Sequence, residues 1–344
     1  MRNHLKGIVD DVMKRVILRD WDVVVDIGSS DGTLLRNYPD YVLKVGFEPS
    51  NIRMVEPTPP RLKTINSYFG RARAGKITLP KAKVITAIAM FYDLEDPNAF
   101  LQDIKKVLAP DGLFVIQMNY LPAMLANNAV DNISHEHLCY YSLKTLDYLL
   151  LKNGLSIQDH SFNPINGGSF RVYVKHTQPG TIPILGDGPV YDAWMKEKAL
   201  KLDTLEPYRA FAQRVQENAY KLRHVLIGAV TGYTQAGKKP SQPKRVYVLG
   251  TSTRGSVLMQ LSDINAGLTP FAVDRDPEKV GKTYVNNIPI ISEEQARASP
   301  PDYYLVLPYW FISEIAEREK AFLMNGGKFI VPLPVPYTVS YDKI

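Results

Sequence analysis

Residues 23–35 read Val-Val-Val-Asp-Ile-Gly-Ser-Ser-Asp-Gly-Thr-Leu-Leu, an apolar run that breaks into a turn of small residues. Three consecutive valines cannot alternate with polar residues, so we expect a strand covered on both faces, as in a parallel α/β sheet. The turn then lies at the carboxyl edge of the sheet, where open α/β folds bind ligands. Gly28 and Gly32 allow a ligand to approach the backbone, and we expect a helix after them whose first amides donate hydrogen bonds to it.

Two carboxylates near this turn favour one kind of ligand. Asp26 ends the first strand, and Glu48 ends a second apolar segment at residues 42–47. A carboxylate in the second place can accept hydrogen bonds from both hydroxyls of a ribose. Asp26 would repel a phosphate, and the Gly-X-Gly-X-X-Gly pattern of dinucleotide sites is absent here. The pair favours S-adenosylmethionine, with its cationic amino-acid tail. The alternative is an ordinary turn in which Asp26 caps a helix.

Composition narrows the class of protein. The 344 residues are 45% hydrophobic and 22% charged, as in a globular protein long enough for two domains. The net charge is 41 − 35 = +6 without a basic run, so we expect no nucleic-acid partner. Cys139 is the single cysteine, which excludes an intramolecular disulfide and a multi-thiolate zinc site. With neither a signal peptide nor an apolar run of ~20 residues, we expect a cytoplasmic protein without a membrane partner.

Strands and helices alternate along the first half, which indicates a doubly wound sheet. Gly154 follows the last helix of this series as its expected terminating residue. The expected elements are helices at residues 5–18, 98–108 and 140–153, strands at 42–47, 62–65, 84–90, 113–118, 155–159 and 169–175, and a turn at 110–112.

Two stretches rich in proline and glycine, residues 178–189 and 236–243, mark boundaries, and residues 191–232 between them predict one long helix or two. A second α/β series then begins, with Gly250 to Gly255 as a second glycine loop. The expected elements of this series are strands at residues 245–249, 270–273, 303–307 and 328–332 and a helix at 256–264.

Five motifs occur in order along the chain. They are Asp26 to Leu35, Phe47-Glu48-Pro49, Ser134-His135-Glu136-His137, Gly167-Gly168-Ser169-Phe170-Arg171 and Gly326 to Pro332. Together they resemble the nucleotide-sugar C-methyltransferases that build branched deoxysugars, over about residues 5–337. In that family a 4-keto sugar on a nucleoside diphosphate loses a proton beside the ketone. The resulting enolate then attacks the methyl group of S-adenosylmethionine.

The resemblance implies that the third motif is catalytic. His137 would be the base or proton shuttle, Glu136 its partner at the sugar, and His135 lies beside them. Removing a carbon-bound hydrogen needs a base of near-neutral pKa, for which histidine is suited. No metal is expected, because the sequence indicates no third and fourth ligand for a pair of histidines. The alternative for this segment is a solvated polar loop.

Residues on both sides of the reaction are expected from their places after strands and in motifs. Arg254 suggests a phosphate or other anionic group, and Trp310 a stacked base, unless the second glycine loop is purely structural. The donor residues are expected to be Asp26, Gly28, Ser29, Asp31, Thr33, Glu48, Pro49, Asn66, Phe69, Ala89 and Met90. The acceptor residues are expected to be Tyr92, Asn119, Ser134, Tyr141, Asn166, Arg171, Arg254 and Trp310.

The chain departs from the family at three points. We expect no cysteine-rich zinc module ahead of the methyltransferase domain; Ser134 replaces a tyrosine; and Asn166 replaces a histidine. No phenol then polarises the ketone, unless Tyr92, Tyr140 or Tyr141 does so. All three departures lie on the acceptor side and leave use of the methyl donor intact.

The sequence thus predicts an α/β protein with three parts. These are a doubly wound, Rossmann-like class I methyltransferase domain at residues 1–180, a helical linker at 181–243 and a second, smaller Rossmann-like domain at 244–344 on the acceptor side. The predicted enzyme transfers methyl from S-adenosylmethionine to a small sugar-derived acceptor, such as a nucleotide-linked keto sugar, held between the domains. The alternatives are an O- or N-methyltransferase of another small molecule and a non-catalytic nucleoside-binding partner protein.

Overall fold

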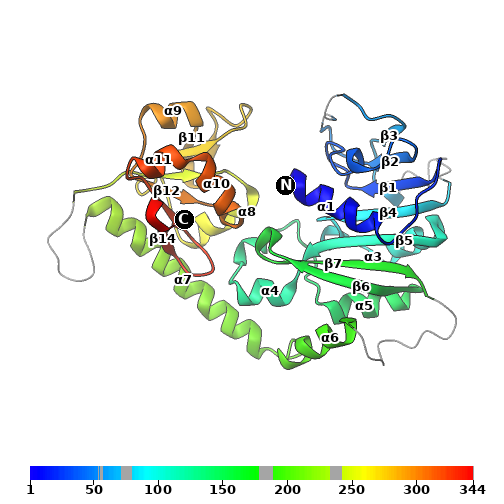
Figure 1. Cartoon of the computed structure of the whole chain (residues 1–344). Coiled ribbons are helices and arrows are strands. Elements are labelled where there is room, and N and C mark those ends of the chain that lie inside the picture. Colours follow the sequence, from blue (N-terminus) through cyan, green and yellow to red (C-terminus); the bar gives the residue numbers. More distant parts are fainter. Residues whose placement is uncertain (53, 55–56, 71–79, 178–188, 233–241, 344) are drawn as a thin grey trace. The chain divides into compact units, whose positions relative to one another are not determined.

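The structure is a computed structural model, and it describes all residues except 53, 55–56, 71–79, 178–188, 233–241 and 344 (Figure 1). Most of the two boundary stretches predicted at residues 178–189 and 236–243 therefore lies outside the described residues. The chain forms two compact units, which we call the N-terminal and C-terminal units. The N-terminal unit comprises Met1–Leu121, Leu138–Asn163 and Ser169–Leu200, and the C-terminal unit Pro122–His137, Pro164–Gly168 and Lys201–Ile344.

The N-terminal unit is built on a seven-stranded sheet in the order β3-β2-β1-β4-β5-β7-β6. All neighbours are parallel except β7, which runs antiparallel to both β5 and β6. The prediction of a doubly wound sheet is confirmed, and the sheet ends in the antiparallel pair β7 and β6. The strands are β1 Val23–Ile27, β2 Leu43–Phe47, β3 Leu62–Ile65, β4 Ala82–Ile88, β5 Leu108–Asn119, β6 Leu155–Asn163 and β7 Ser169–His176. The helices are α1 Arg2–Met13, α3 Pro97–Val107, α5 Leu143–Lys152 and α6 Pro189–Ala199, with 3-10 turns η1 Leu35–Asn37 and η2 Phe91–Asp93.

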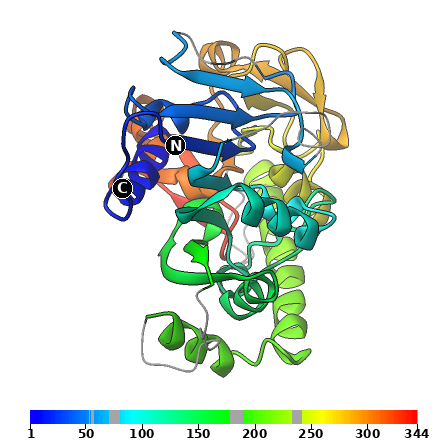
Figure 2. The ribbon, with the colours of Figure 1, turned by 90° about the vertical axis from the view of Figure 1, so that its right-hand side faces the viewer.

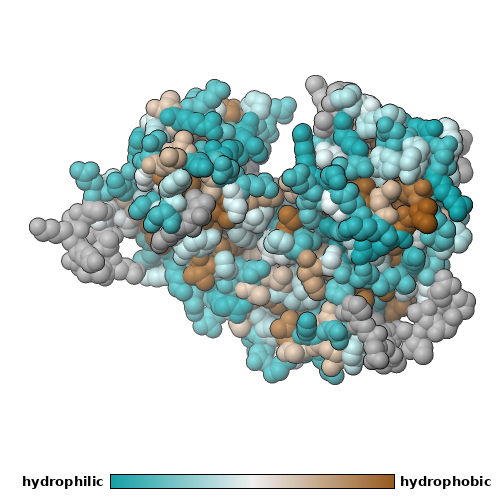
Figure 3. Space-filling view, viewed as in Figure 1, coloured by the Kyte–Doolittle hydropathy of each residue, from teal (hydrophilic) through white to brown (hydrophobic). Residues whose placement is uncertain are grey.

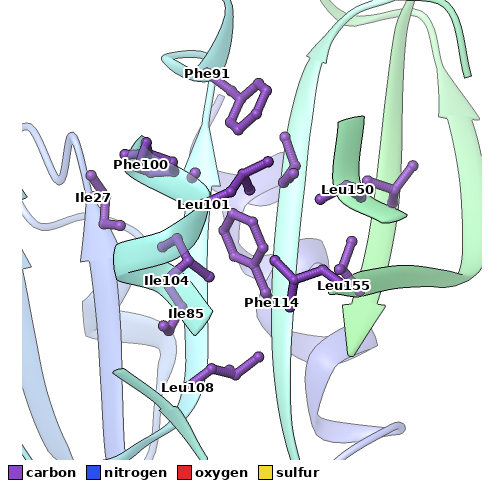
Figure 4. Close-up of a cluster of buried hydrophobic side chains, with 14 of the residues drawn as sticks. Ile27, Ile85, Phe91, Phe100, Leu101, Ile104, Leu108, Phe114, Leu150 and Leu155 are labelled. Carbon is purple, nitrogen blue, oxygen red and sulfur yellow. The ribbon is translucent and has the colours of Figure 1, made fainter. Parts of the chain in front are cut away.

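The three valines of β1 are buried on both faces of this sheet, as their uninterrupted run predicts. Val23 and Val25 belong to one core, while Val24 belongs to a second core on the opposite face, with residues of α1. Figure 4 shows the first core, in which Leu101 of α3 points toward Phe114 of β5. The sheet that carries the glycine turn is therefore fixed by apolar packing from both sides.

Two local predictions in this unit are wrong. After the glycine turn only the short 3-10 turn η1 forms, because Pro39 and the start of β2 at Leu43 follow too soon for an α-helix. The turn expected at residues 110–112 lies inside β5, where the pairing with β4 shifts register between Ala82 and Val84. The Pro-Asp-Gly sequence thus makes an irregularity within one long strand.

The C-terminal unit contains a second seven-stranded sheet, in the order β10-β11-β9-β8-β12-β13-β14. Its five inner strands are parallel, and its two edge strands are antiparallel to their neighbours. This sheet has as many strands as the first one and forms the second α/β domain that the sequence predicted. The strands are β8 Val246–Leu249, β9 Ala272–Asp274, β10 Thr283–Tyr284, β11 Ile288–Ser292, β12 Tyr303–Val306, β13 Lys328–Val331 and β14 Tyr337–Val339.

The helices of this unit come from both halves of the sequence. The longest of the described helices is α7, which Figures 1 and 2 show as one continuous rod. The helices are α4 Leu121–Ala126, α7 Glu206–Thr231, α8 Thr253–Leu261, α9 Glu293–Ala298, α10 Ile312–Arg318 and α11 Lys320–Met324. The 3-10 turns are η3 Val130–Asn132, η4 Ile165–Gly167, η5 Val285–Asn287, η6 Tyr309–Phe311 and η7 Tyr341–Lys343.

The surface of each unit is mixed in polarity. Figure 3 shows mostly hydrophilic residues on the visible face, with hydrophobic ones in small groups. Among the described residues, no helix has the length and apolar character needed to cross a membrane.

Two segments of the first half of the sequence, Pro122–His137 and Pro164–Gly168, fold with the C-terminal unit. They carry the Ser134 to His137 motif and Asn166. The predicted catalytic motif is therefore positioned by the second sheet and its helices, in a different unit from the glycine turn.

Candidate functional site

The glycine turn after β1 has the backbone conformation that its sequence requires. Gly28 has φ 74° and Gly32 φ 78°, in the left-handed region that favours glycine. The amides of Gly28 and Ser29 donate to the carbonyl of Phe47, at 2.8 and 3.0 Å, and so fix the turn to the end of β2. The Oγ of Ser29 is buried, and no described residue is its hydrogen-bond partner. Such an orphaned hydroxyl fits a polar ligand bound at this turn.

Glu48 lies beside the turn, at the end of β2. Its carboxylate accepts hydrogen bonds from the amides of Ser30 at 2.8 Å and Ser50 at 2.9 Å. Partial burial opposes ionisation, but the hydrogen bonds from Ser50 and Ser30 outweigh it and lower the pKa of Glu48. Asn66 donates to the carbonyl of Ser50 at 2.9 Å and so supports the same loop. An ionised acceptor in this place suits the two hydroxyls of a ribose.

Asp26 is only 3% exposed and lies beneath the turn. The hydroxyl of Thr86 donates to its Oδ1 at 2.6 Å. Burial raises the pKa of Asp26 to about 7 against this hydrogen bond, and the negative charge of Glu48 adds to the rise. Near neutral pH the carboxyl is thus only partly ionised, and a cationic ligand group close to it would favour the charged form.

The other predicted donor residues lie in the same unit. Asp31 accepts a hydrogen bond from the amide of Thr33 at 3.0 Å, while Pro49 is exposed. Ala89 has φ 56°, and its amide donates to the carbonyl of Gln117 at 2.7 Å. The chain thus leaves β4 through a strained turn at the carboxyl end of the strand.

Two apolar residues complete this side. A Cβ added to Gly28 would lie 3.4 Å from Cγ of Met90, so the end of β4 packs directly against the glycine turn. Phe69 is buried, with its ring edge-on to Phe47 at 5.2 Å between centroids. We find Phe69 to be part of the core that supports the end of β2.

Four of the predicted acceptor residues belong to the N-terminal unit: Tyr92, Asn119, Tyr141 and Arg171. All four are buried. The Nε of Arg171 donates to Gln117 at 3.0 Å, and its Nη1 contacts the carboxylate of Asp11 at 2.9 Å. The guanidinium of Arg171 thus links α1 to the sheet in this structure.

His137 belongs to the C-terminal unit. Its Nδ1 lies 2.7 Å from the carbonyl oxygen of Asn132. A carbonyl only accepts, so Nδ1 carries the proton, and in the neutral ring Nε2 holds the lone pair. Burial and the charge of Arg254 lower the pKa of His137, although the bond to Asn132 and the charge of Glu136 oppose them. A histidine that is neutral at pH 7, with its basic nitrogen defined, suits proton abstraction.

The neighbours of His137 in the motif differ in exposure. The side chain of His135 is 88% exposed and that of Glu136 50%, with 3.8 Å between Nε2 and Oε1. Ser134 has a buried Oγ with no hydrogen-bond partner in the described part of the chain. Of the three predicted catalytic residues, His137 is thus the one in a partly buried, electrostatically defined setting.

Asp131, which was not among the residues predicted from the sequence, is fully buried. Its Oδ2 accepts from Nε of Arg254 at 3.0 Å and Nη2 at 2.6 Å, and its Oδ1 from the hydroxyl of Tyr309 at 3.1 Å. Arg254 also donates to the carbonyl of Asn166 at 3.1 Å and lies 3.8 Å from the ring centroid of Trp310. An aspartate among the apolar residues Ala129, Val130 and Ile133 is a sign of a buried carboxylate. The sequence does not indicate its partner, because Arg254 lies 123 residues further along the chain. These contacts join Arg254, Trp310 and Asn166, all predicted acceptor residues, in one cluster.

The second glycine loop is tied to its own sheet. Both the amide and the hydroxyl of Thr251 donate to Oδ2 of Asp274, the amide at 3.0 Å. Lys279 lies 3.4 Å from the same oxygen. The Asp274 carboxylate, in the place where a ribose partner would stand, thus bonds to the loop itself.

Two family models match the chain in order. Residues 1–160 match a methyltransferase domain, and residues 164–334 match the C-methyltransferase C-terminal domain. The chain is 32% identical over 350 residues to the C-methyltransferase NovU of Streptomyces niveus, covering 99% of this chain and 79% of that protein.

Solved methyltransferase structures are similar over about half of the chain. The N-methyltransferase NodS from Bradyrhizobium japonicum is 12% identical, with TM-score 0.40, over 52% of this chain and 96% of that one. The 1,6-didemethyltoxoflavin-N1-methyltransferase of Burkholderia thailandensis is 14% identical, with TM-score 0.39, over 52% of this chain and 78% of that one. TM-scores this low indicate no particular function. Two matched domains, together with a relative aligned along nearly the whole chain, instead show that the protein belongs to the S-adenosylmethionine-dependent C-methyltransferases.

Proposed function

We propose that the enzyme methylates a carbon atom of a small sugar-derived acceptor, a nucleotide-linked keto sugar, with His137 as the base. The observation that carries this proposal is the 2.7 Å contact between Nδ1 of His137 and the carbonyl of Asn132. It leaves Nε2 as the basic nitrogen of a ring whose pKa is lowered by burial and by Arg254. The ordered sugar-methyltransferase motifs support the acceptor class.

The residues proposed to bind the methyl donor belong to the N-terminal unit. S-adenosylmethionine supplies, when bound, a methyl group as an electrophile. Glu48 is the proposed acceptor for the ribose hydroxyls, since hydrogen bonds keep it ionised. Asp26 is the proposed partner of the amino-acid tail, and Ser29 has a buried hydroxyl to offer a polar group.

The residues proposed to bind the methyl acceptor and to act on it belong to the C-terminal unit. His137 would take a proton from the carbon beside the ketone onto Nε2, which leaves an enolate whose carbon is the nucleophile. Ser134 Oγ, Arg254 Nη1 and Trp310 Nε1 are buried donors without a hydrogen-bond partner among the described residues. They are the proposed donors to oxygens of the acceptor, because buried donors in a folded protein are normally satisfied.

Deuterium exchange tests the proposal. The enzyme is incubated in D2O with a nucleoside-diphosphate 4-keto sugar and S-adenosylhomocysteine, and the carbon-bound hydrogen beside the ketone is followed by NMR. We expect exchange with the wild type and its loss in His137→Gln. The matched control is His224→Gln, since the Nδ1 of His224 also contacts a carbonyl, that of Tyr220 at 3.0 Å.

The methylated product gives the second readout. With S-adenosylmethionine present, we expect a new methyl group bonded to carbon. A methoxy or N-methyl product would overturn the proposal, as would exchange that persists in folded His137→Gln.

A further inference from the structure

Arg254 is linked to the ring of His137 through the carboxylate of Asp131 and the backbone carbonyl of the next residue, Asn132. The first link is the buried carboxylate of Asp131, whose two oxygens accept from Arg254 and Tyr309. A fully buried carboxylate is tolerated only when it is paired and hydrogen-bonded. Asp131 therefore holds η3 against the start of α8 and against η6.

The second link is the peptide next to Asp131. Asn132 is 1% exposed, and its carbonyl oxygen is the group that contacts Nδ1 of His137. The amide of His137 also donates to the carbonyl of Ser134 at 3.2 Å, so the segment 132–137 is a compact turn. Displacing Asp131 would displace the neighbouring carbonyl, and with it the group that sets the tautomer of the ring.

Arg254 is itself held on three sides. Two of its nitrogens bind Asp131, one of these also donates to the carbonyl of Asn166, and the guanidinium lies over the ring of Trp310. Such a planar, multiply held arginine cannot be replaced by lysine without loss of geometry, although lysine keeps the charge. Replacement by lysine therefore separates two effects of Arg254 on His137: the placement of the ring through Asp131, and the influence of a nearby positive charge.

We propose that Arg254 and Asp131 are positioning residues for His137: Asp131 places the Asn132 carbonyl that fixes the imidazole tautomer, and Arg254 holds Asp131 in place. The charged groups that act on the ring are Arg254 and, in the opposite sense, Glu136. The inference rests on the proposed role of His137 as the base. Its structural part, however, is measurable without any substrate.

Histidine NMR provides that measurement. In protein with 15N-labelled histidine, His137 is assigned by its absence from His137→Gln, and its tautomer and titration are read from the ring nitrogens. We expect the Nδ1-protonated tautomer in the wild type. In Arg254→Lys we expect a mixture of tautomers with a titration close to that of the wild type, because the charge remains. In Arg254→Met we expect both a mixture and titration at higher pH, because the charge that disfavours imidazolium is gone.

Kinetics gives the second readout. Arg254→Lys should lower kcat by ~10- to 100-fold through misplacement of the base, with little change in KM for S-adenosylmethionine. In Arg254→Met the acid limb of the pH profile should also move to higher pH. The matched control is Arg297→Met, which removes a partner at 3.1 Å from the buried carboxylate of Glu319 in the same unit. It should change stability without changing the tautomer or the pH profile.

Tyr309→Phe provides a milder change, since it removes one hydroxyl from Asp131. If Arg254→Met does not fold, Arg254→Lys and Tyr309→Phe decide, and we expect a partial shift of tautomer in each. The wild-type tautomer in both folded variants would overturn the inference. Failure of the proposed acceptor would instead remove the kinetic readout alone and leave the NMR result intact.

Discussion

The hydroxyl of Thr86 donates a 2.6 Å hydrogen bond to Oδ1 of Asp26, beneath the glycine turn. Burial nevertheless raises the pKa of Asp26 from 3.8 to about 7. The folded protein thus holds this proton more tightly than the unfolded chain does. Stability therefore falls as the pH rises from about 4 to about 7, through the interval between the two pKa values.

Asp26→Asn should consequently stabilise the protein above pH 7, by at most about 4 kcal/mol, with no gain near pH 4. The same change should weaken binding of S-adenosylhomocysteine by roughly ten- to a hundredfold. Scanning calorimetry at pH 4 and pH 8 and titration calorimetry measure the two effects. Asp20→Asn, an exposed carboxylate, is the control. A lower Tm of Asp26→Asn at pH 8 would contradict the argument.

Glu48→Gln should weaken binding of S-adenosylhomocysteine by roughly tenfold or more, because a charge-assisted acceptor at the end of β2 is lost. The control is Glu95→Gln, an exposed carboxylate after η2. Titration calorimetry compares the two variants with the wild type. An unchanged Kd for Glu48→Gln would remove Glu48 from the donor site.

His137→Gln should lower kcat by ~10²–10⁴ and leave the affinity for S-adenosylhomocysteine unchanged. The pKa of His137 lies below its ordinary value of 6.5. The base is active when neutral, so the rate of the wild type should fall only at pH values below 6.5. If His137→Gln lost donor binding but kept full turnover at saturating donor, His137 would belong to the methyl-donor site and would not be the base that acts on the acceptor.

Ser134→Tyr restores, at the first position of the catalytic motif, the tyrosine of the resembled family. If the acceptor is a keto sugar, we expect equal or higher kcat, because a phenol can donate to the ketone oxygen. Steady-state kinetics with the keto sugar as the varied substrate tests this. A large rise in KM for the acceptor would show instead that the space beside Ser134 holds a bulkier molecule.

The elements that the sequence predicted well are those that packing alone defines. The valines of β1 and the apolar positions of α1 are buried in the cores, so the apolar pattern was sufficient to predict both elements. Pro110 to Gly112 has the composition of a turn, but pairing with β4 keeps it within a strand. The edge strands β10 and β14 are only two and three residues long and partly polar, so no pattern indicated them.

In the candidate site, residues at strand ends were accessible to prediction, since turn chemistry places them locally. Glu48 and Gly28 are of this kind. Asp131 and Arg254 are not, because a buried ion pair between segments far apart in sequence leaves no periodic trace. The tautomer of His137 depends on a backbone carbonyl, which sequence letters do not encode.

The chain passes between the two units at five points: after residues 121, 137, 163, 168 and 200. A domain exchange made by joining one N-terminal half to a foreign C-terminal half would therefore pair Asp131 and Asn166 with a sheet they did not evolve with. Chimeras of related enzymes should fold more often when residues 122–137, 164–168 and 201–344 are all taken from the same parent. In this protein a single folded unit, the C-terminal one, is thus encoded by three separate stretches of the gene.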